Sequence, residues 1–227
     1  MRRSTISLIV RQRADTCPST FLNRTLGMLE YKFTFLYRFG AFVRSLLYGP
    51  EIEENFFAGL QREYNELVPY LPNVSSPAIL DIGAGLGGID IYLAGHYQNA
   101  ALYLLDRSES NKTTPGFSPS HGFYNSFDSA REVLTSKGVR KEQGHFLTPE
   151  QLHTLPQKVD IVLSLFSCGF HYPISTYQNV FEDCLEGGGT VILDIRKGTG
   201  QKEEAQKLGN IFVIRGDDTA ERIKITK

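Results

Sequence analysis

Two kinds of hydrophobic pattern alternate along most of this chain. Stretches in which apolar residues recur every three or four positions, the period of an amphipathic helix, alternate with short continuous apolar runs. Such runs are typical of strands that are buried on both faces of a sheet, and they occur at residues 78–82, 101–105, 159–165 and 190–195. Strands and helices in alternation predict an α/β fold around a largely parallel sheet.

Weaker patterns supply the remaining elements of this region. Residues 139–145 form the weakest strand of the set. Two apolar runs at 211–215 and 222–226 flank a turn and predict a terminal hairpin. Ser126 is a suitable N-cap residue, and helices are expected at 126–137, 175–185 and 202–208.

The beginning of the chain lies outside this alternation. A helix is expected at 51–71, where apolar residues are spaced by threes and fours. Residues 23–48 are rich in aromatic side chains, and their charges lie all around the helical wheel. We therefore expect a helix that packs on a larger body or on a second copy of the chain, with the lining of a substrate pocket as the alternative. Residues 1–22 are polar and are expected to lack regular structure unless other parts hold them.

A loop at 73–77, which follows Pro72 and ends in Pro77, separates this region from the first strand. We divide the chain there into a helical N-terminal extension at 1–75 and an α/β domain at 76–227. The extension is expected to act as a cap, a substrate lid or an oligomerisation element. A length of 227 residues suits one substantial domain with an appendage, and it is too short for two full domains.

The composition is that of an ordinary globular protein. A net charge of −1 gives no basic excess of the kind that indicates nucleic acid as a partner. The three cysteines (Cys17, Cys168 and Cys184) form no paired motif, so we expect neither a disulfide framework nor a zinc site. The apolar run near the N-terminus is too short for a signal peptide, and no run reaches the ~18 residues of a membrane span. A cytoplasmic protein is expected.

The N-terminal region differs from the whole in charge. Residues 1–49 carry eight basic side chains against two acidic ones, a local charge of +6. Such an excess would suit an anionic surface or acceptor. A solvated or internally paired face is the simpler explanation.

The strand expected at 78–82 leads directly into a glycine turn. Gly83, Gly85 and Gly88 fit the pattern G-x-G-x-x-G, which brings bare backbone against a nucleotide ligand and lets the next helix approach the strand. Asp106 ends the following strand, 23 residues after Gly83, where a carboxylate can accept hydrogen bonds from both hydroxyls of a ribose. Both nicotinamide-dependent oxidoreductases and S-adenosylmethionine enzymes use this βαβ unit.

Three features favour S-adenosylmethionine over a dinucleotide. Asp81 precedes the turn inside the strand, where dinucleotide-binding folds usually keep an apolar residue. Some 77 residues come before the first strand, whereas dinucleotide fingerprints usually open their domain. Because a hairpin is expected directly after the fifth strand and its helix, we expect no separate substrate domain.

The segment Ile79-Leu80-Asp81-Ile82-Gly83-Ala84-Gly85-Leu86-Gly87 resembles the first motif of the class I S-adenosylmethionine-dependent methyltransferases, and the resemblance covers roughly residues 76–227. It implies a Rossmann-like sheet of seven strands in which the last strand is antiparallel. It also implies that the cofactor S-adenosylmethionine binds to a set of residues at the carboxyl ends of the strands. The resemblance implies that Asp81 and the backbone from Gly83 through Ala84 to Gly85 hold its methionine part and that Asp106 holds its ribose. Its adenine is assigned to Phe146, and Gly87, Arg107 and Leu165 are further expected cofactor contacts.

The acceptor is expected against the loop at 166–173, after the fourth strand. This loop has neither the Asp/Asn-Pro-Pro-Tyr motif of enzymes that methylate amino groups of bases nor the Pro-Cys motif of cytosine-C5 enzymes. Asp194 alone is too little for a catechol-type metal site, so no metal is expected. His171 remains as the general base that an alcohol nucleophile needs, because the reference pKa of histidine, ~6.5, suits that role. His121 is the reserve, and a pocket-lining role for His171 is the alternative.

Residues 167–173 and 122–125 are similar to segments of proteins classed as sugar O-methyltransferases. This second resemblance implies a saccharide hydroxyl as acceptor, in free, lipid-linked or nucleotide-linked form. Phe166, Ser167, Tyr172 and Tyr124 are then expected to contact the substrate.

The sequence therefore predicts a methyltransferase that modifies a sugar or a similar hydroxyl and that could self-associate through its aromatic N-terminal helix. Three alternatives stay open. They are methyl transfer to another small-molecule hydroxyl, nicotinamide-dependent oxidoreduction, and a non-catalytic subunit that binds the cofactor and docks a partner.

Overall fold

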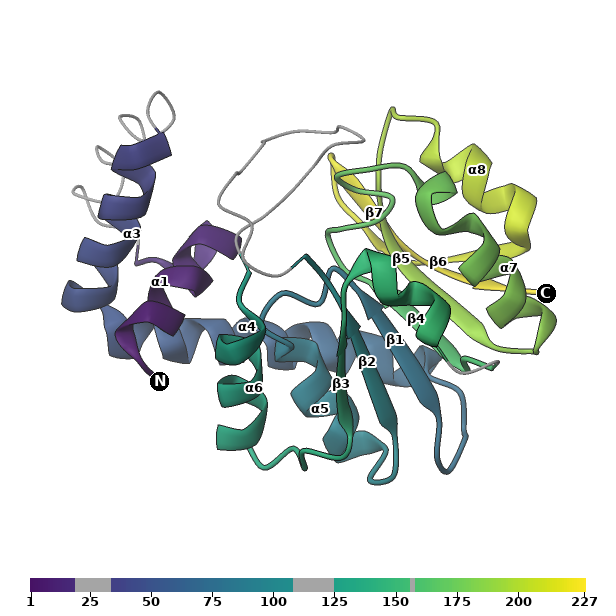
Figure 1. The fold of residues 1–227 in the computed structure, drawn as a ribbon. Coiled ribbons are helices and arrows are strands. Elements are labelled where there is room, and N and C mark those ends of the chain that lie inside the picture. The colour runs from purple at the N-terminus through teal and green to yellow at the C-terminus, as the bar shows by residue number, and fades with distance from the viewer. Residues whose placement is uncertain (19–33, 108–124, 156–157) are drawn as a thin grey trace.

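The computed structural model describes residues 1–18, 34–107, 125–155 and 158–227 (Figure 1). The N-terminal part contains α1 (Arg3–Gln12), the 3-10 turn η1 (Ala14–Thr16), α3 (Thr34–Leu47), α4 (Gly49–Leu67) and η2 (Val68–Tyr70). The strands are β1 (Ala78–Ile82), β2 (Ala101–Leu105), β3 (Gly144–Leu147), β4 (Ile161–Ser164), β5 (Thr190–Arg196), β6 (Asn210–Gly216) and β7 (Ala220–Thr226). Between them lie α5 (Gly88–His96), α6 (Phe127–Ser136), η3 (Pro149–Thr154), η4 (Ile174–Tyr177), α7 (Gln178–Glu186) and α8 (Gln201–Leu208).

The strands form one sheet in the order β3-β2-β1-β4-β5-β7-β6. The first five strands in this order, β3, β2, β1, β4 and β5, are parallel to one another, and β7 is inserted antiparallel between β5 and β6. The predicted Rossmann-like sheet of seven strands with an antiparallel last strand and a helical N-terminal segment is confirmed. Because β1 lies in the middle of the parallel part, its sequence is apolar on both faces, with Asp81 as the exception.

Two of the predicted elements are displaced in the structure. The third strand begins at Gly144 and not at 139, because residues 140–143 form a turn in which the Gln143 side chain bonds the carbonyl oxygens of Gln98 and Ala100. Val139 is buried beside the end of α6 without joining the sheet. The helix expected at 175–185 starts as the 3-10 turn η4 and becomes α-helical at Gln178.

Residues 1–22 were expected to lack regular structure unless other parts hold them, and the second case applies to the described part, where α1 is a ten-residue helix packed on α3 and α4. Its buried positions, Thr5, Ile6, Ile9 and Val10, follow the helical period and pack against α3 and α4. The free energy that holds this short helix comes from that packing, which a local pattern does not reveal.

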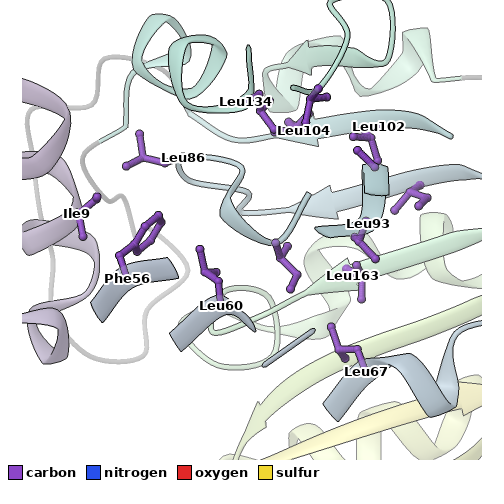
Figure 2. Close-up of a cluster of buried hydrophobic side chains, with 14 of the residues drawn as sticks. Ile9, Phe56, Leu60, Leu67, Leu86, Leu93, Leu102, Leu104, Leu134 and Leu163 are labelled. Atoms are coloured by element: carbon purple, nitrogen blue, oxygen red, sulfur yellow. The ribbon is translucent and has the colours of Figure 1, made fainter. Parts of the chain in front are cut away.

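The core has two layers, one on each face of the sheet. The layer under α5 and α6 also includes α1 and α4, so the N-terminal part shares its core with the sheet (Figure 2). Phe56, Leu60 and Leu67 of α4 belong to this layer together with Leu86 and Leu93. The opposite layer packs α7 and α8 on β4, β5 and β7.

The helix α3 packs against α1, as expected of an element that covers a larger body, yet part of its surface is apolar and exposed. Within the described residues, no helix is long and apolar enough to cross a membrane. The exposed apolar side chains of α3 are Phe39, Phe42, Leu46 and Leu47.

Candidate active site

A cavity of about 700 Å³ opens at the carboxyl ends of β1, β2 and β4. In parallel α/β sheets this edge is where ligands bind, since the loops that follow the strands meet there. A volume of this size lies in the ordinary range for small-molecule sites, ~300–1,000 Å³.

The glycine turn after β1 forms one wall of the cavity. Gly83 and Gly85 adopt φ angles of 78° and 57°, in the left-handed region that favours glycine. The amides of Gly83 and Ala84 donate to the carbonyl oxygen of Leu105 at 2.7 and 3.3 Å, which ties the turn to the end of β2. The turn therefore presents backbone and no bulky side chain to the cavity.

Asp106, directly after β2, faces the same turn. The amide of Gly85 donates to its Oδ2 atom at 2.8 Å, and the amide of Arg107 donates to its Oδ1 atom at 2.6 Å. Burial raises the pKa of Asp106 to about 6, although the two backbone hydrogen bonds act in the opposite direction. The carboxylate is thus fixed in orientation beside the glycine turn.

Asp81 lines the cavity from the end of β1, and the carboxyl of Asp90 lies behind it in the first turn of α5. Burial, together with the charge of Asp90, raises the pKa of Asp81 well above its ordinary value. Burial likewise raises the pKa of Asp90 to about 7. Asp90 was not singled out from the sequence, where an acid at the start of a helix is the usual pattern.

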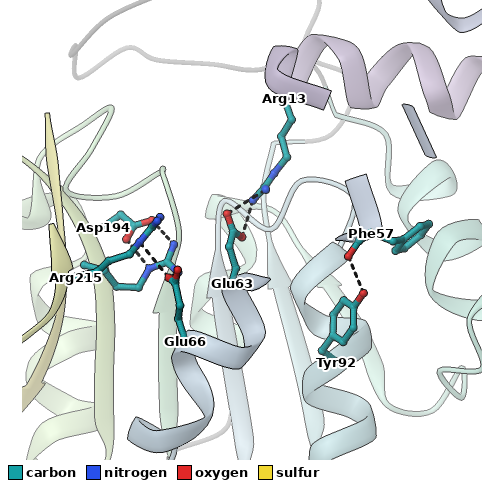
Figure 3. Close-up of polar contacts among 8 residues, drawn as sticks. Arg13, Phe57, Glu63, Glu66, Tyr92, Asp194 and Arg215 are labelled. Carbon is teal, nitrogen blue, oxygen red and sulfur yellow. Dashed lines mark hydrogen bonds and ion pairs between the residues drawn. The ribbon is translucent and has the colours of Figure 1, made fainter. Parts of the chain in front are cut away.

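The end of α1 forms a roof over the glycine turn. Arg13 binds Glu63 of α4 through two hydrogen bonds of 3.1 and 2.9 Å, and both residues line the cavity (Figure 3). Next to Arg13, the side chain of Gln12 reaches the turn, since its Oε1 atom lies 3.0 Å from where a β-carbon of Gly85 would be. Sequence reasoning missed this roof because residues 1–22 were not expected to be helical.

The loop after β4 forms the facing wall and folds back on itself. The amides of Phe170 and His171 donate to the carbonyl oxygen of Ser167 at 3.1 and 2.8 Å. The hydroxyl groups of Ser167 and Tyr172 lie 3.0 Å apart. Burial raises the pKa of the Tyr172 phenol well above its ordinary value, so this hydroxyl stays neutral.

An ion-pair network lies under this loop and joins the sheet to α4. Arg222 of β7 binds both oxygens of Asp194, its register partner on β5, at 2.7 and 2.8 Å. Its remaining nitrogen reaches Glu66 of α4, which also pairs with Arg215 (Figure 3). Phe166 adopts a φ angle of 55°. The Cζ atoms of Arg215 and Arg222 each lie 5.9 Å from the centroid of its ring. Asp194 is therefore engaged in a structural pair.

Most of the predicted site residues meet at this one cavity. Its lining includes Asp81, Gly83, Ala84, Gly85, Asp106, Arg107, Leu165, Phe166, Ser167, His171 and Tyr172. Two others lie elsewhere. Gly87 faces Leu104 and Leu134 at the start of α5, and the ring of Phe146 packs on Phe127 and the guanidinium of Arg131.

On the side of β3, Pro149 is the residue that lines the cavity, in the place where the adenine contact was assigned to Phe146. His121 and Tyr124 lie outside the described residues. Other residues also line the cavity although the sequence did not mark them as part of the site. Among them are Phe56, Arg62, Glu63, Glu66, Phe170, Thr176, Tyr177, Arg215 and Asp217.

No protein-family model matches this chain, and no curated protein matches its sequence. Solved structures do match its fold. Precorrin-6Y C5,15-methyltransferase from Geobacter metallireducens superposes with a TM-score of 0.54 at 16% identity, covering 74% of this chain and 89% of that one. Magnesium protoporphyrin IX methyltransferase from Synechocystis PCC 6803 gives a TM-score of 0.50 at 18% identity, covering 75% and 79%. The fold is that of the class I methyltransferases. The cavity lies at the carboxyl edge of the parallel strands, which is where α/β folds of this kind bind their ligands.

Proposed function

We propose that this protein is an S-adenosylmethionine-dependent methyltransferase that modifies a hydroxyl oxygen of a sugar or a similar small molecule. The observation that carries the proposal is the joint placement of Asp81, the glycine turn and Asp106 around one cavity. Solved structures of the same fold include the Synechocystis enzyme with S-adenosylmethionine bound.

The residues present fit this cofactor in chemistry as well as in place. The left-handed Gly83 and Gly85 present bare backbone to the cavity, and the side chains of Ser167 and Gln12 pack against them so closely that a β-carbon would meet these atoms. Asp106 offers carboxylate oxygens to a ribose, and the buried acids Asp81 and Asp90 offer negative charge to an ammonium group. The sheet order also argues against a dinucleotide, because β7 is antiparallel where a dinucleotide fold continues in parallel.

When bound, S-adenosylmethionine would supply an activated methyl group. The protein's part is then to hold the acceptor oxygen in line, to exclude water and to accept a proton. An imidazole nitrogen of His171 is proposed as the proton acceptor, with Phe166, Ser167 and Tyr172 around the substrate. The end of α1 is proposed as a cap, since Gln12 and Arg13 line the cavity above the glycine turn.

Two measurements test the proposal. A ligand that binds the folded state raises the unfolding temperature, so S-adenosylhomocysteine is expected to stabilise the protein while NAD(H) leaves it unchanged. The reverse pattern would overturn the methyltransferase assignment in favour of an oxidoreductase. A labelled-methyl transfer screen over nucleotide sugars, glycolipids and small alcohols then identifies the acceptor. Transfer to amines alone would overturn the hydroxyl.

A further inference from the structure

Asp90 is a buried carboxylate without a fixed hydrogen-bond donor among the described residues. The residue is 0% exposed, and neither carboxylate oxygen accepts a well-formed hydrogen bond from an N–H group of another described residue. An ionised carboxylate in such a place is strongly unfavourable unless something compensates it. The position therefore needs a proton or a cation.

The neighbour of Asp90 is Asp81, which lines the cavity from the end of β1. Two buried carboxyl groups in contact do not both ionise readily, so the pair keeps a proton between them. The directions in which the pKa values of the two carboxyl groups are shifted agree with this. Burial and the charge of Asp90 raise the pKa of Asp81, and the hydrogen bond from Asp81 favours the ionised form of Asp90. Protonated Asp81 thus donates to Asp90.

Other charged groups around the pair do not supply the missing cation. Asp106, at the end of β2, adds negative charge and further favours the protonated form of Asp81. Arg13, directly after α1, acts in the opposite direction, but its guanidinium is held by both oxygens of Glu63. On α4, which packs on α5, Arg62 and Glu66 also line the cavity, and Glu66 pairs with Arg215 and Arg222.

We propose that Asp81 and Asp90 form a proton-sharing pair that releases its proton to solvent when the ammonium group of the methyl donor's methionine part binds. Asp90 is then a positioning residue that acts through Asp81. The exchange keeps the charge balance, because one proton leaves the two carboxylates as one ammonium charge arrives. The inference rests on the proposed function and adds a property that the fold alone does not imply.

A proton released on binding makes the affinity depend on pH. Because the unliganded protein must give up this proton, S-adenosylhomocysteine, which carries the same ammonium group, is expected to bind more tightly as pH rises. The gain is at most about tenfold per pH unit for one proton. The change is expected around neutral pH, because burial raises the pKa of Asp90 to about 7.

Isothermal titration calorimetry of the full chain with S-adenosylhomocysteine tests this directly. At about pH 7 the binding enthalpy is measured in phosphate and in Tris, whose ionisation enthalpies differ. The expected result is a difference that corresponds to roughly one proton released per ligand. Equal enthalpies in both buffers, together with an affinity that does not change with pH, would overturn the pair and leave the proposed function standing. Absence of S-adenosylhomocysteine binding would overturn both.

A pair of matched variants separates Asp90 from a general effect of charge. In Asp90→Asn the amide can donate to Asp81 and keep it ionised, so proton release is expected to fall close to zero and the pH profile to flatten. Asp128→Asn is the control, because Asp128 also lies in the first turn of a helix but is exposed on α6. It is expected to retain the wild-type release. Persistent proton release in Asp90→Asn would show that Asp90 is not the partner.

Discussion

The backbone of Gly83 lies directly against the side chain of Ser167, so closely that a β-carbon at position 83 would overlap the Cβ and Oγ atoms of Ser167. Gly83 begins the turn after β1, and Ser167 belongs to the loop after β4. The contact therefore joins the proposed donor side of the cavity to its proposed acceptor side. Any side chain at Gly83 has to move one wall relative to the other.

Gly83→Ala is expected to weaken S-adenosylhomocysteine binding by more than tenfold, since a loss of ~1.4 kcal/mol already gives that factor. Calorimetric titration measures it. The control is Gly188→Ala, because Gly188 has nearly the same φ, 76° against 78°, but open space around its α-carbon. That variant is expected to lose roughly 1–2 kcal/mol of stability through backbone strain and to bind normally.

A second change separates the clash from the strain. Replacing Ser167 by Gly in the Gly83→Ala background removes the overlapping atoms and leaves the φ angle as it is. Partial recovery of binding is expected in this double variant. If Gly83→Ala alone binds like the wild type, the two walls are not coupled through this contact.

The sequence predicted the sheet and the site to different extents. The strands β1, β2, β4 and β5 are buried on both faces, so their apolar runs are continuous and easily recognised. Asp81, inside β1, and Asp106, directly after β2, were predicted from the glycine-turn motif, which places them at the carboxyl ends of neighbouring parallel strands. The roof was not, because Arg13 meets Glu63 across 50 positions of sequence and only the tertiary fold brings them together. The role of Asp90 was also hidden, since its burial depends on α4 and α6 covering α5.

The ion pair between Arg13 and Glu63 is expected to hold the roof over the glycine turn. Glu63→Gln removes the charge and keeps the size, and it is expected to weaken S-adenosylhomocysteine binding by about 10- to 150-fold, in line with ~1.5–3 kcal/mol for a hydrogen bond to a charged group. Titration calorimetry gives the affinity. Glu204→Gln serves as control, because Glu204 pairs with Lys207 on the exposed side of α8.

Limited proteolysis provides an independent readout of the roof. Cleavage near the end of α1 is expected to speed up in Glu63→Gln and to slow again when the ligand is added. Unchanged affinity and unchanged cleavage would mean that Arg13 packs beside the cavity without covering it.

The buried acids predict that the unliganded protein loses stability as pH rises toward neutrality. Burial raises the pKa of Asp90 to about 7, whereas an unfolded Asp titrates near ~3.9. Between those values the folded state binds more protons than the unfolded state, so the free energy of unfolding falls with increasing pH. For Asp90 the total loss is at most about 4 kcal/mol. The chain contains no Trp, so urea unfolding at about pH 5 to 8 is best followed by circular dichroism.

Asp90→Asn is expected to reduce this slope and to be more stable than the wild type at about pH 8, with the difference shrinking toward pH 5. A residual slope is expected from Asp106, whose pKa burial raises to about 6. Asp128→Asn, which changes an exposed carboxylate, should follow the wild-type curve. A wild-type stability that rises from pH 5 to pH 8 would contradict protonated acids in the folded state.

His171 lies in the loop after β4, where its amide bonds the Ser167 carbonyl oxygen and its side chain lines the cavity beside Phe170. If His171 takes the proton of the acceptor hydroxyl, His171→Ala is expected to lower methyl transfer by ~10²–10⁴-fold. Binding of S-adenosylhomocysteine is expected to change little, because the donor contacts lie on the opposite wall. His153→Ala is the matched control, since His153 is exposed on η3. The rate is measured by transfer of labelled methyl to the acceptor found in the screen. Transfer that stays within a few-fold of wild type would mean that His171 only lines the pocket. An equal loss of binding and transfer would mean that its side chain stabilises the conformation of the loop.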